Sequence, residues 1–578
     1  MKRVLERVLA ACVLVLLAWP AWSCTTIIVG KQASVDGSVL VSHSEDGLGD
    51  PRMVYIPAKD HEPGSVRHVY DSDVALGYEP RFGSDPVHRF NIDERSPRYK
   101  APAGVPPSQP LGSIPQVSHT YAYFDGNYGL MNEHQLIMGE CTDKAKVHPE
   151  AEEGKRIFYS SELSRVALER CKTAREAVKL MGELIMTYGY YGTGETLLVG
   201  DPDEGWVMEM CGYDMDGTDG VWVAQRVPDD GFFVAANQFR IREVKEDAED
   251  MMYSPNIFEV AKAKGWWKSE DGPLDWTAVY GDGEFHHPYY SLRRVWRAQS
   301  LVAPSLKLSP WVEDALTKAY PFSIRPDNKL DVRDVMRIHR DVYEGTEFDL
   351  SKGLAAGPFS DPVRFEGGAE ATMGDQSGPS VNGAFERPLS IYRCVYAYVC
   401  QARKDLPDAI GGVIWFGPDR PATSVLMPFY PGAGNLPDSL QRGNPLVFDR
   451  GSMWTAFNYV ANYAGLKYSY MIKDITAQSE AFEARFFGRQ ADVEAQALKL
   501  WKAGDTSGAA KVLADHSQQA ADDVLAAWWK LSEDLYIKYN DGYLNEPDNI
   551  AQPLFYPNWW LKAVGYENGP LEYKSKTR

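Results

Sequence analysis

The pattern of apolar and polar positions changes sharply near the start of the chain. Apolar residues run without a break from position 8 to position 19, after a positively charged beginning. A helix that crosses a bilayer needs about 20 such residues, whereas the apolar part of a secretory signal has about 7–15. Ala21 and Ser23 supply the small residues that signal peptidase accepts. The sequence therefore predicts a signal peptide over residues 1–23, export to the periplasm or the extracellular space, and Cys24 as the first mature residue.

Two other interpretations of this start stay open. In the first interpretation, the apolar run is a membrane anchor that is not removed. In the second it is a lipoprotein signal, which is also cut before a cysteine, so that Cys24 carries lipid. Such signals usually have Leu at −3 and Gly or Ala at −1, and the segment Ala21, Trp22 and Ser23 fits that pattern poorly.

After Cys24 the pattern alternates with a period of two, which is typical of strands. Two β-branched and apolar runs flank the pair Asp36-Gly37, which is a hairpin signal. Residues 57–117 are rich in Pro, Gly and charge, and they predict long surface loops. Further strands are predicted within 119–142, with a turn near Asn132, and over 195–200, 206–212, 221–227 and 231–239, the last two continuing the same sheet.

Helical spacing appears in three places. Apolar residues recur at this spacing within 161–170, and Thr173 with Glu176 forms a capping box before a second helix that Gly189 ends. Residues 475–539 are almost wholly helix-forming. Strand clusters separated by helices predict a layered α+β architecture. We expect the helical C-terminal region to pack against the core, with a partner-binding role as the alternative.

Composition excludes some classes of partner. The net charge of −20 argues against nucleic acid, because phosphate binding relies on clustered Lys and Arg. After residue 19 we find no apolar stretch long enough to cross a membrane, so no stable membrane insertion is expected after signal cleavage. With 7 cysteines in 578 residues the chain is not a disulfide scaffold, although export permits a bridge or two. The sequence leaves the oligomeric state open, a homo-oligomer included.

A cysteine at the start of a chain carries two useful groups on one residue. Its thiol is a nucleophile, and its free α-amine has a pKa of about 7.7–8.0, close to the value of about 8.5 for the thiol. The amine can therefore take the thiol proton at neutral pH with little mismatch. The same logic operates at N-terminal threonines. Removal of the signal peptide would create this base, because before cleavage the nitrogen of Cys24 is an amide.

Several segments together carry a family resemblance: "CTTIIVG", "SHSEDG", "GLMNEH", "SRVALERCKTAREAV", "LLVGDPDEGWVMEMCG", "AANQFRI", "YYSLRRVWRA" and "VYEGTEFDLSKG". In this order they resemble the dipeptidase A family of N-terminal-nucleophile cysteine peptidases, relatives of secernin and more remotely of choloylglycine hydrolase and penicillin V acylase. The resemblance covers nearly all of the mature chain, and the last hundred residues are least diagnostic. It implies a four-layer αββα sandwich over residues 24–470, followed by a helical region over 471–578, and no metal or cofactor.

The resemblance also implies roles for single residues. Cys24 matches the nucleophile, and Asp46 matches the aspartate that holds the α-amine. Asn237 matches the oxyanion donor, and Arg294 the arginine that closes the site around Cys24. Alternatives stay open for each partner: Asp46 as an ordinary turn carboxylate, Asn237 as a strand-end turn residue, and Arg294 replaced by Arg293 or Arg297 or part of a solvated basic helix.

Two positions depart from the acylase relatives. His43 stands where they often carry Arg, and Thr142 stands where they often place a second oxyanion Asn, so that a backbone amide near Thr142 is left for substrate binding. Both departures weaken any transfer of acylase substrate choice. Adjacent histidines, His286 and His287, point apart and complete no metal site. Cys141 is expected to be a buried small residue rather than a second nucleophile.

The sequence thus predicts an exported cysteine-type dipeptidase that hydrolyses dipeptides or short peptides through Cys24. One alternative is an amidase or acylase acting on non-peptide N-acyl amides, with the same first step and a different pocket. The other is a lipid-anchored protein that binds peptides without catalysis.

Overall fold

The computed structural model describes residues 24–47, 49–70, 92–100, 107–213, 220–246, 248–285, 287–365, 383–445 and 447–573. The predicted signal peptide lies outside the described residues, as does His286.

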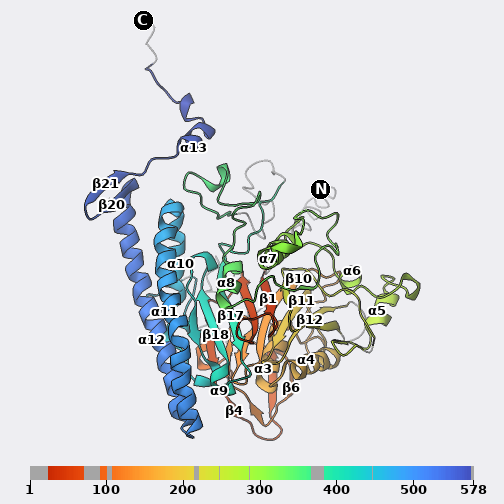
Figure 1. Ribbon diagram of the computed structural model, residues 1–578. Helices are drawn as coiled ribbons and strands as arrows, with labels where there is room; N and C mark the ends of the chain where they lie inside the picture. Colours follow the sequence, from red (N-terminus) through yellow and green to blue (C-terminus); the bar gives the residue numbers. More distant parts are fainter. Residues whose placement is uncertain are drawn as a thin grey trace, which may run out of the picture.

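Within these residues, two large antiparallel sheets dominate the fold (Figure 1). The first has seven strands in the order β16 (Ser323–Ile324), β14 (Phe232–Ala235), β1 (Thr25–Val29), β2 (Val39–Asp46), β17 (Cys394–Ala402), β18 (Val413–Pro418) and β19 (Met427–Phe429). The second has eight strands in the order β15 (Met251–Tyr253), β13 (Gly220–Val227), β12 (Gly205–Gly212), β11 (Gly194–Gly200), β10 (Ile137–Asp143), β9 (Gly129–Asn132), β8 (Tyr123–Asp125) and β3 (Val54–Ile56).

The two sheets pack against each other through their central strands. Strands β1 and β2 contact β10 and β11, and the apolar side chains between them belong to one buried core. Gly139 permits this close approach, because an added Cβ would lie 2.7 Å from the hydroxyl oxygen of Thr26 and 3.2 Å from the side chain of Val41. A larger residue at 139 would therefore push the sheets apart at the start of β1.

Helices lie on the outer faces of both sheets. Helix α3 (Ser160–Arg170) contacts β9, and α4 (Ala174–Tyr188) contacts β11 to β13 over a second buried core. Helix α7 (Leu292–Val302) contacts β14, and α8 (Val332–His339) contacts β17 and β2. The shorter helices are α5 (Ile257–Ala263), α6 (Trp276–Tyr280), α9 (Asp408–Gly411) and α13 (Asn558–Ala563). The prediction of a mixed helix-and-strand fold is confirmed.

The structure contains the helix start, the helix end and the strand pairing that the sequence predicts most clearly. The hydroxyl of Thr173 accepts from the amide of Glu176, whose carboxylate accepts from the amide of Thr173, so the predicted capping box is present. Gly189 ends α4 with φ of 75°, a conformation that favours glycine. β1 and β2 pair as predicted around Asp36-Gly37, but they are joined by residues 30–38 rather than by a two-residue turn.

Three details differ from the predictions. The strands at 221–227 and 231–239 do not continue one sheet, because the turn after Val227 sends β14 into the other sheet beside β1. The described residues of the region 57–117 are not only loops: β4 (Lys59–Asp60) pairs with β7 (His119–Thr120), just after the region, and β5 (Val66–Tyr70) pairs with β6 (Pro110–Pro115). A further small sheet of β20 (Tyr543–Glu546) and β21 (Asn549–Pro553) comes after the C-terminal helices.

The C-terminal region is largely helical, as predicted, and most of it is a long helical hairpin. It consists of α11 (Tyr468–Lys502) and α12 (Thr506–Tyr539), it packs on α10 (Met453–Ala464) and β19, and Figure 1 shows it along one side of the sheets. The rings of Phe457 and Trp528 stack with their centroids 4.2 Å apart. Buried apolar side chains of the hairpin belong to the same core as those between the sheets. The domain boundary at residue 470 stays a prediction.

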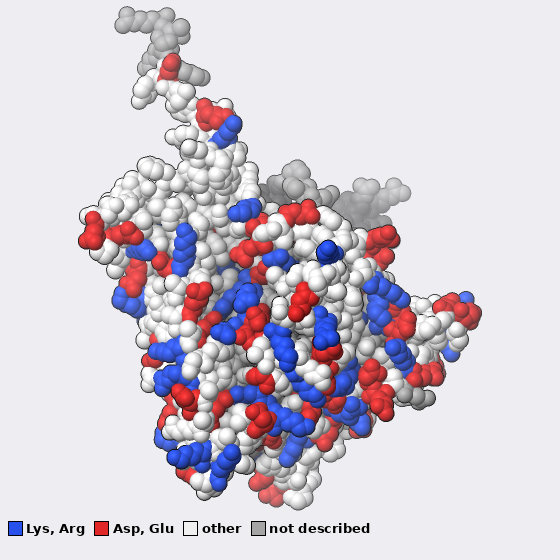
Figure 2. Space-filling model, viewed as in Figure 1, with Lys and Arg blue, Asp and Glu red and all other residues white. Residues whose placement is uncertain are grey.

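In the described part of the chain, no helix is both long and apolar enough to span a bilayer. On the face shown in Figure 2, acidic and basic side chains are interspersed.

A buried ion pair joins the hairpin to the sheet. Glu494 of α11 accepts from both terminal nitrogens of Arg403 at 2.6 and 2.8 Å and from the hydroxyl of Tyr430 at 2.9 Å. Glu494→Ala should lower the free energy of unfolding by about 3 kcal/mol, because it leaves the buried charge of Arg403 unpaired. The exposed change Asp492→Ala on the same helix should cost about 0.5 kcal/mol or less. Chemical denaturation measures both, and equal losses would contradict this account.

Candidate active site

Cys24 lies directly before β1 and is fully buried. β1 pairs on one side with β2, where Thr26 is opposite His43, and on the other with β14, where Thr26 is opposite Ala235. Side chains along a strand alternate between its two faces. The candidate site is therefore organised by the side chains that β2 presents on each face and by the residues just after β14.

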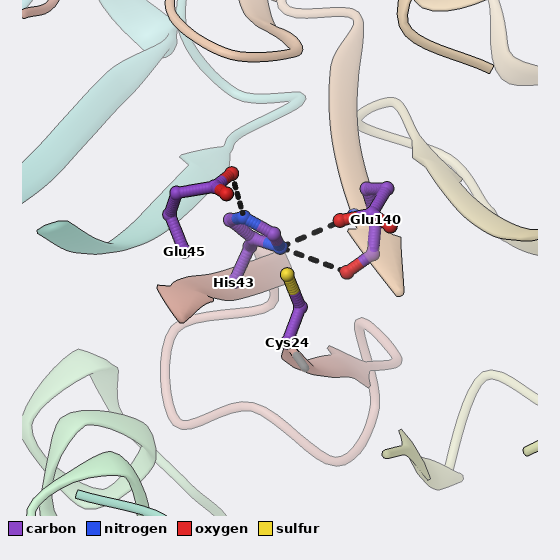
Figure 3. A group of neighbouring side chains, drawn as sticks. All are labelled: Cys24, His43, Glu45 and Glu140. Carbon is purple, nitrogen blue, oxygen red and sulfur yellow. Dashed lines mark hydrogen bonds and ion pairs between the residues drawn. The ribbon is translucent and has the colours of Figure 1, made fainter. Parts of the chain in front are cut away.

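One face of β2 brings His43 and Glu45 beside the thiol of Cys24 (Figure 3). His43 Nδ1 donates to the backbone carbonyl of Glu140 on the facing sheet at 2.8 Å, and His43 Nε2 lies 3.2 Å from Oε2 of Glu45. The other carboxylate oxygen of Glu45, Oε1, is buried and has no hydrogen-bond partner among the described residues. A buried acceptor of this kind is costly unless something binds it.

Glu140 adds a second carboxyl group next to the thiol. Its Oε1 accepts from the hydroxyl of Thr142 at 2.9 Å, while its Oε2 is buried without a hydrogen-bond partner among the described residues. Tyr159 donates to Glu195. Burial raises the pKa of Glu140 to about 8 and that of Glu195 well above its ordinary value. A carboxyl group with a pKa of about 8 is mostly protonated at neutral pH, so Glu140 holds a proton there.

The opposite face of β2 carries Asp46. Its Oδ2 accepts from Arg387 Nη2 at 2.7 Å and from the hydroxyl of Ser44 at 3.0 Å, and that hydroxyl in turn accepts from the amide of Thr25 at 3.2 Å. Oδ1 of Asp46 is buried without an N–H or O–H partner among the described residues, and the thiol of Cys394 is its neighbour. Asp46 is thus tied to the residue after Cys24.

Arg294 connects Cys24 to Asn237. Its Nη1 donates to the carbonyl of Cys24 at 2.9 Å and to the hydroxyl of Thr25 at 3.0 Å, while its Nη2 donates to Oδ1 of Asn237 at 2.6 Å. Asn237 Nδ2 donates to the carbonyl of Thr142 at 2.6 Å. Asn237 has φ of 64°, a left-handed conformation that asparagine tolerates better than most residues. Arg294 therefore fixes which end of this amide faces Thr142.

The competing arginines lie elsewhere. Arg293 pairs with Glu386 at 3.2 Å and lies over the ring of Phe348, and Arg297 pairs with Asp341 at 2.6 Å. Arg293 and Arg294 are both fully buried, so the alternative of a solvated basic helix is wrong for these two residues. Of the three arginines, Arg294 contacts Cys24.

The environment of Cys24 keeps its thiol protonated. Burial, followed by the carboxyl groups of Glu140, Glu45 and Asp46, raises the pKa of the Cys24 thiol well above its ordinary value. A thiolate is the reactive form of cysteine. A reaction through this sulfur would therefore need a base that removes the thiol proton, since the thiol is protonated at rest.

The described cysteines form no disulfide bond, and all six of them are buried. Cys141 places its Sγ 3.5 Å from the carbonyl of Cys24 and 2.7 Å from the amide of Asn237. Burial raises its pKa well above the ordinary value as well.

A metal ion would find one candidate set of donors in the described residues. Atoms of Cys24, His43, Glu45 and Glu140 lie within 4.8 Å of one another. Both ring nitrogens of His43 already face partners, Glu140 and Glu45, so metal binding would cost one of these contacts. The expected absence of a metal stays a prediction.

The structure brings together all five residues that the sequence singled out, in two groups. Asp46 contacts Ser44 and through it Thr25, and Arg294, Asn237 and Thr142 form a chain of hydrogen bonds from the carbonyl of Cys24. Thr142 presents its carbonyl to Asn237 and its hydroxyl to Glu140. The roles assigned to these residues stay predictions.

Sequence reasoning missed Glu45, Glu140, Glu195 and Arg387. The alternation in "SHSED" was a usable signal for Glu45, since it places residue 45 on the same face as residue 43. Glu140 and Glu195 each lie within a predicted strand. They come close to Cys24 only because β10 and β11 pack against the other sheet. Arg387 lies 341 positions from Asp46, and nothing in the sequence links the two.

Comparison with known proteins defines the class. A model of peptidase family C69 matches residues 23–80 and 124–481, which is more than half of the chain. The chain belongs to peptidase family C69, and the resemblance found in the sequence is confirmed. The match begins one residue before Cys24 and ends early in α11, in keeping with the weak signal of the last hundred residues.

Several curated proteins are similar to this chain. A probable dipeptidase of Salmonella dublin is 26% identical over 415 residues, covering 71% of this chain and 81% of that protein. Probable dipeptidase B of Lactococcus lactis subsp. lactis (strain IL1403) is 24% identical, covering 72% and 76%. Dipeptidase A of Lactobacillus helveticus is 23% identical, covering 72% and 77%. Penicillin V acylase from Agrobacterium tumefaciens, a solved structure, covers 70% and 86% at 11% identity, and its TM-score of 0.26 is too low to carry an argument.

The raised pKa of Glu140 makes stability depend on pH. Between its ordinary value of 4.5 and about 8, the folded protein keeps a proton that the unfolded chain releases. The free energy of unfolding should therefore fall as pH rises from 5 to 8, by at most about 1.4 kcal/mol per pH unit for this group. Glu140→Gln cannot titrate, so its slope should be shallower.

Unfolding by denaturant at several pH values measures these slopes. The exposed change Glu62→Gln is the control and should keep the wild-type slope. An unchanged slope in Glu140→Gln would show that this carboxyl group does not hold the proton.

Proposed function

We propose that this protein is an exported cysteine-type dipeptidase whose nucleophile is Cys24 at the start of the mature chain. The observation that carries the proposal is that Arg294 joins Asn237 to the carbonyl of Cys24, and Asp46 is linked through Ser44 to the next residue, Thr25, at the point where the C69 match begins. Curated relatives named as dipeptidases, over about three quarters of their length, support the substrate class.

The first chemical step needs the α-amine of Cys24. Removal of residues 1–23 turns the nitrogen of Cys24 from an amide into an amine, which can take the thiol proton directly or through one water. The sulfur then attacks the carbonyl carbon of the scissile peptide bond and forms a C–S bond. The negative charge moves to the carbonyl oxygen of the substrate.

The second step returns the proton. The C–N bond of the peptide breaks, the ammonium group of Cys24 gives its proton to the leaving amine, and a thioester remains. Water then attacks the thioester with the amine as base, which releases the carboxylate product and restores the thiol. Atoms and protons balance without a metal ion or cofactor.

The neighbouring side chains fit the roles proposed for them. Asp46 has a buried Oδ1 without an N–H or O–H partner among the described residues, which suits an acceptor for the new ammonium group. Asn237 donates to Thr142, and an amide nitrogen with two N–H bonds can also donate to the oxyanion. Arg294 holds Asn237 and the carbonyl of Cys24 in fixed relation.

We also propose that the two sheets and their outer helices are the four-layer αββα sandwich of N-terminal-nucleophile hydrolases. The packing of β1 and β2 on β10 and β11 supports this, as do helices α3 and α4 on one side and α7 and α8 on the other.

The mature terminus tests the mechanism directly. N-terminal sequencing and intact mass of the exported protein should show an unmodified chain that starts at Cys24. Added diacylglycerol, or a mature chain that is active with a blocked amine, would contradict the proposed base.

Substitution of the nucleophile is the second test. Cys24→Ser should lower kcat/KM on dipeptides by at least about 100-fold, because the amine is poorly matched to a hydroxyl. The control Cys171→Ser, between α3 and α4, should keep wild-type activity. Full activity of Cys24→Ser, measured on the same dipeptides, would overturn covalent catalysis at Cys24.

A further inference from the structure

Glu45 lies beside the nucleophile, and the proposed mechanism does not use it. It is fully buried, and its group with Cys24, His43 and Glu140 spans less than 4.8 Å. Its Oε2 faces Nε2 of His43, while Oε1 has no partner within the described residues. A buried carboxylate is stabilised by a cation or by hydrogen-bond donors, so Oε1 has the chemistry of a receptor for a positive group.

The other two acids nearby are less suited to hold a cation. Burial raises the pKa of Glu140 to about 8, so this carboxyl group is mostly protonated at neutral pH, and burial shifts the pKa of Glu195 in the same direction. Glu140 also accepts from the hydroxyl of Thr142, and Tyr159 donates to Glu195, although Oε2 of each acid is buried without a partner among the described residues. Glu45 is therefore the better suited of the three to hold a cation, and Asp46 lies on the opposite face of β2 with Arg387.

The distances match the N-terminal residue of a peptide. The nitrogen of an amino acid lies about 2.5 Å from its own carbonyl carbon. A charge-assisted hydrogen bond from ammonium to carboxylate spans about 2.7–2.9 Å, and the sulfur must come within about 3–3.5 Å of the carbonyl carbon. A carboxylate oxygen of Glu45 lies within 4.8 Å of the sulfur of Cys24, so an ammonium group bound to this carboxylate would place the adjacent carbonyl carbon within reach of Cys24.

We infer that Glu45 binds the free α-ammonium group of the substrate's N-terminal residue and so restricts hydrolysis to the first peptide bond of unblocked peptides. This inference rests on the proposed function, since it takes Cys24 as the nucleophile. His43 holds Glu45 through Oε2, which leaves Oε1 to accept from the ammonium group. A non-peptide N-acyl amide has no ammonium group and leaves Glu45 without its partner.

Binding without chemistry tests the receptor. In a Cys24→Ala background, calorimetry should show that L-alanyl-L-alanine binds and that its N-acetylated form binds at least about 100-fold more weakly. Adding Glu45→Gln should weaken the binding of the free dipeptide by a similar factor and leave the N-acetylated form unchanged. The exposed control Glu62→Gln should alter neither. Equal binding of the two ligands, or no effect of Glu45→Gln on the free dipeptide, would overturn the inference.

Kinetics with an intact Cys24 separate the inference from the proposed function. Wild type should cleave the free dipeptide and discriminate by about 100-fold in kcat/KM against the N-acetylated one, with the difference mostly in KM. Cleavage of both at equal rates, with Cys24 still required, would overturn the role of Glu45 and leave the nucleophile in place. Cleavage of the free dipeptide by Cys24→Ala would overturn the proposed function itself.

The wild-type comparison needs no variant, so the inference stays testable if Glu45→Gln does not fold. Where that variant folds, as judged by its thermal midpoint, a purely structural role for Glu45 predicts equal loss on both substrates. A receptor role predicts that discrimination between them collapses.

Discussion

The register of β1 between β2 and β14 is the constraint on which the whole site depends. One pairing sets His43 opposite Thr26, and the other sets Ala235 opposite the same residue, just before the turn at Asn237. A slip of one residue would turn every side chain to the other face of its strand. It would exchange Glu45 for Asp46 or Ser44 beside the sulfur. The burial of all five residues of β1 strongly specifies the register that avoids this.

Arg294 makes the second fixed link, between elements that are far apart in sequence. From α7 it reaches the carbonyl of Cys24 and the side chain of Asn237, both neutral oxygen groups. Burial lowers its pKa, which reflects the cost of keeping a guanidinium group away from water. Several hydrogen bonds to backbone and amide oxygens offset that cost. The site thus uses a buried charge to hold two backbone segments in place.

Sequence alone was more informative for local features than for long-range ones. The capping box at Thr173, the pairing of β1 with β2 and the helical region after α10 depend on patterns within a few turns of chain, and all are present. The placement of β14 in the other sheet was missed, because a run of buried residues does not state which neighbour it pairs with.

The same contrast holds within the site. Cys24 stood out because its position relative to a predicted cleavage point is itself a chemical signal, and Arg294 stood out through a motif that also offered Arg293 and Arg297. Glu140 and Glu195 could not be connected to Cys24 from sequence, since they come close to it only through the packing of β10 and β11 beside the start of β1. Arg387 reaches Asp46 only because the fold closes a loop of 341 residues.

The two faces of β2 carry side chains with different contacts, so residues on one face can change without altering those on the other. Ser44 and Asp46 lie on the face that contacts Arg387. His43 and Glu45 lie on the face that contacts the thiol of Cys24 and the other large sheet. Substitutions at the odd-numbered positions could therefore retune which molecules are accepted, while the even-numbered positions go on anchoring the start of the chain. Substrate selectivity could then change through substitutions on one face of this strand, while the reactivity of Cys24 is kept.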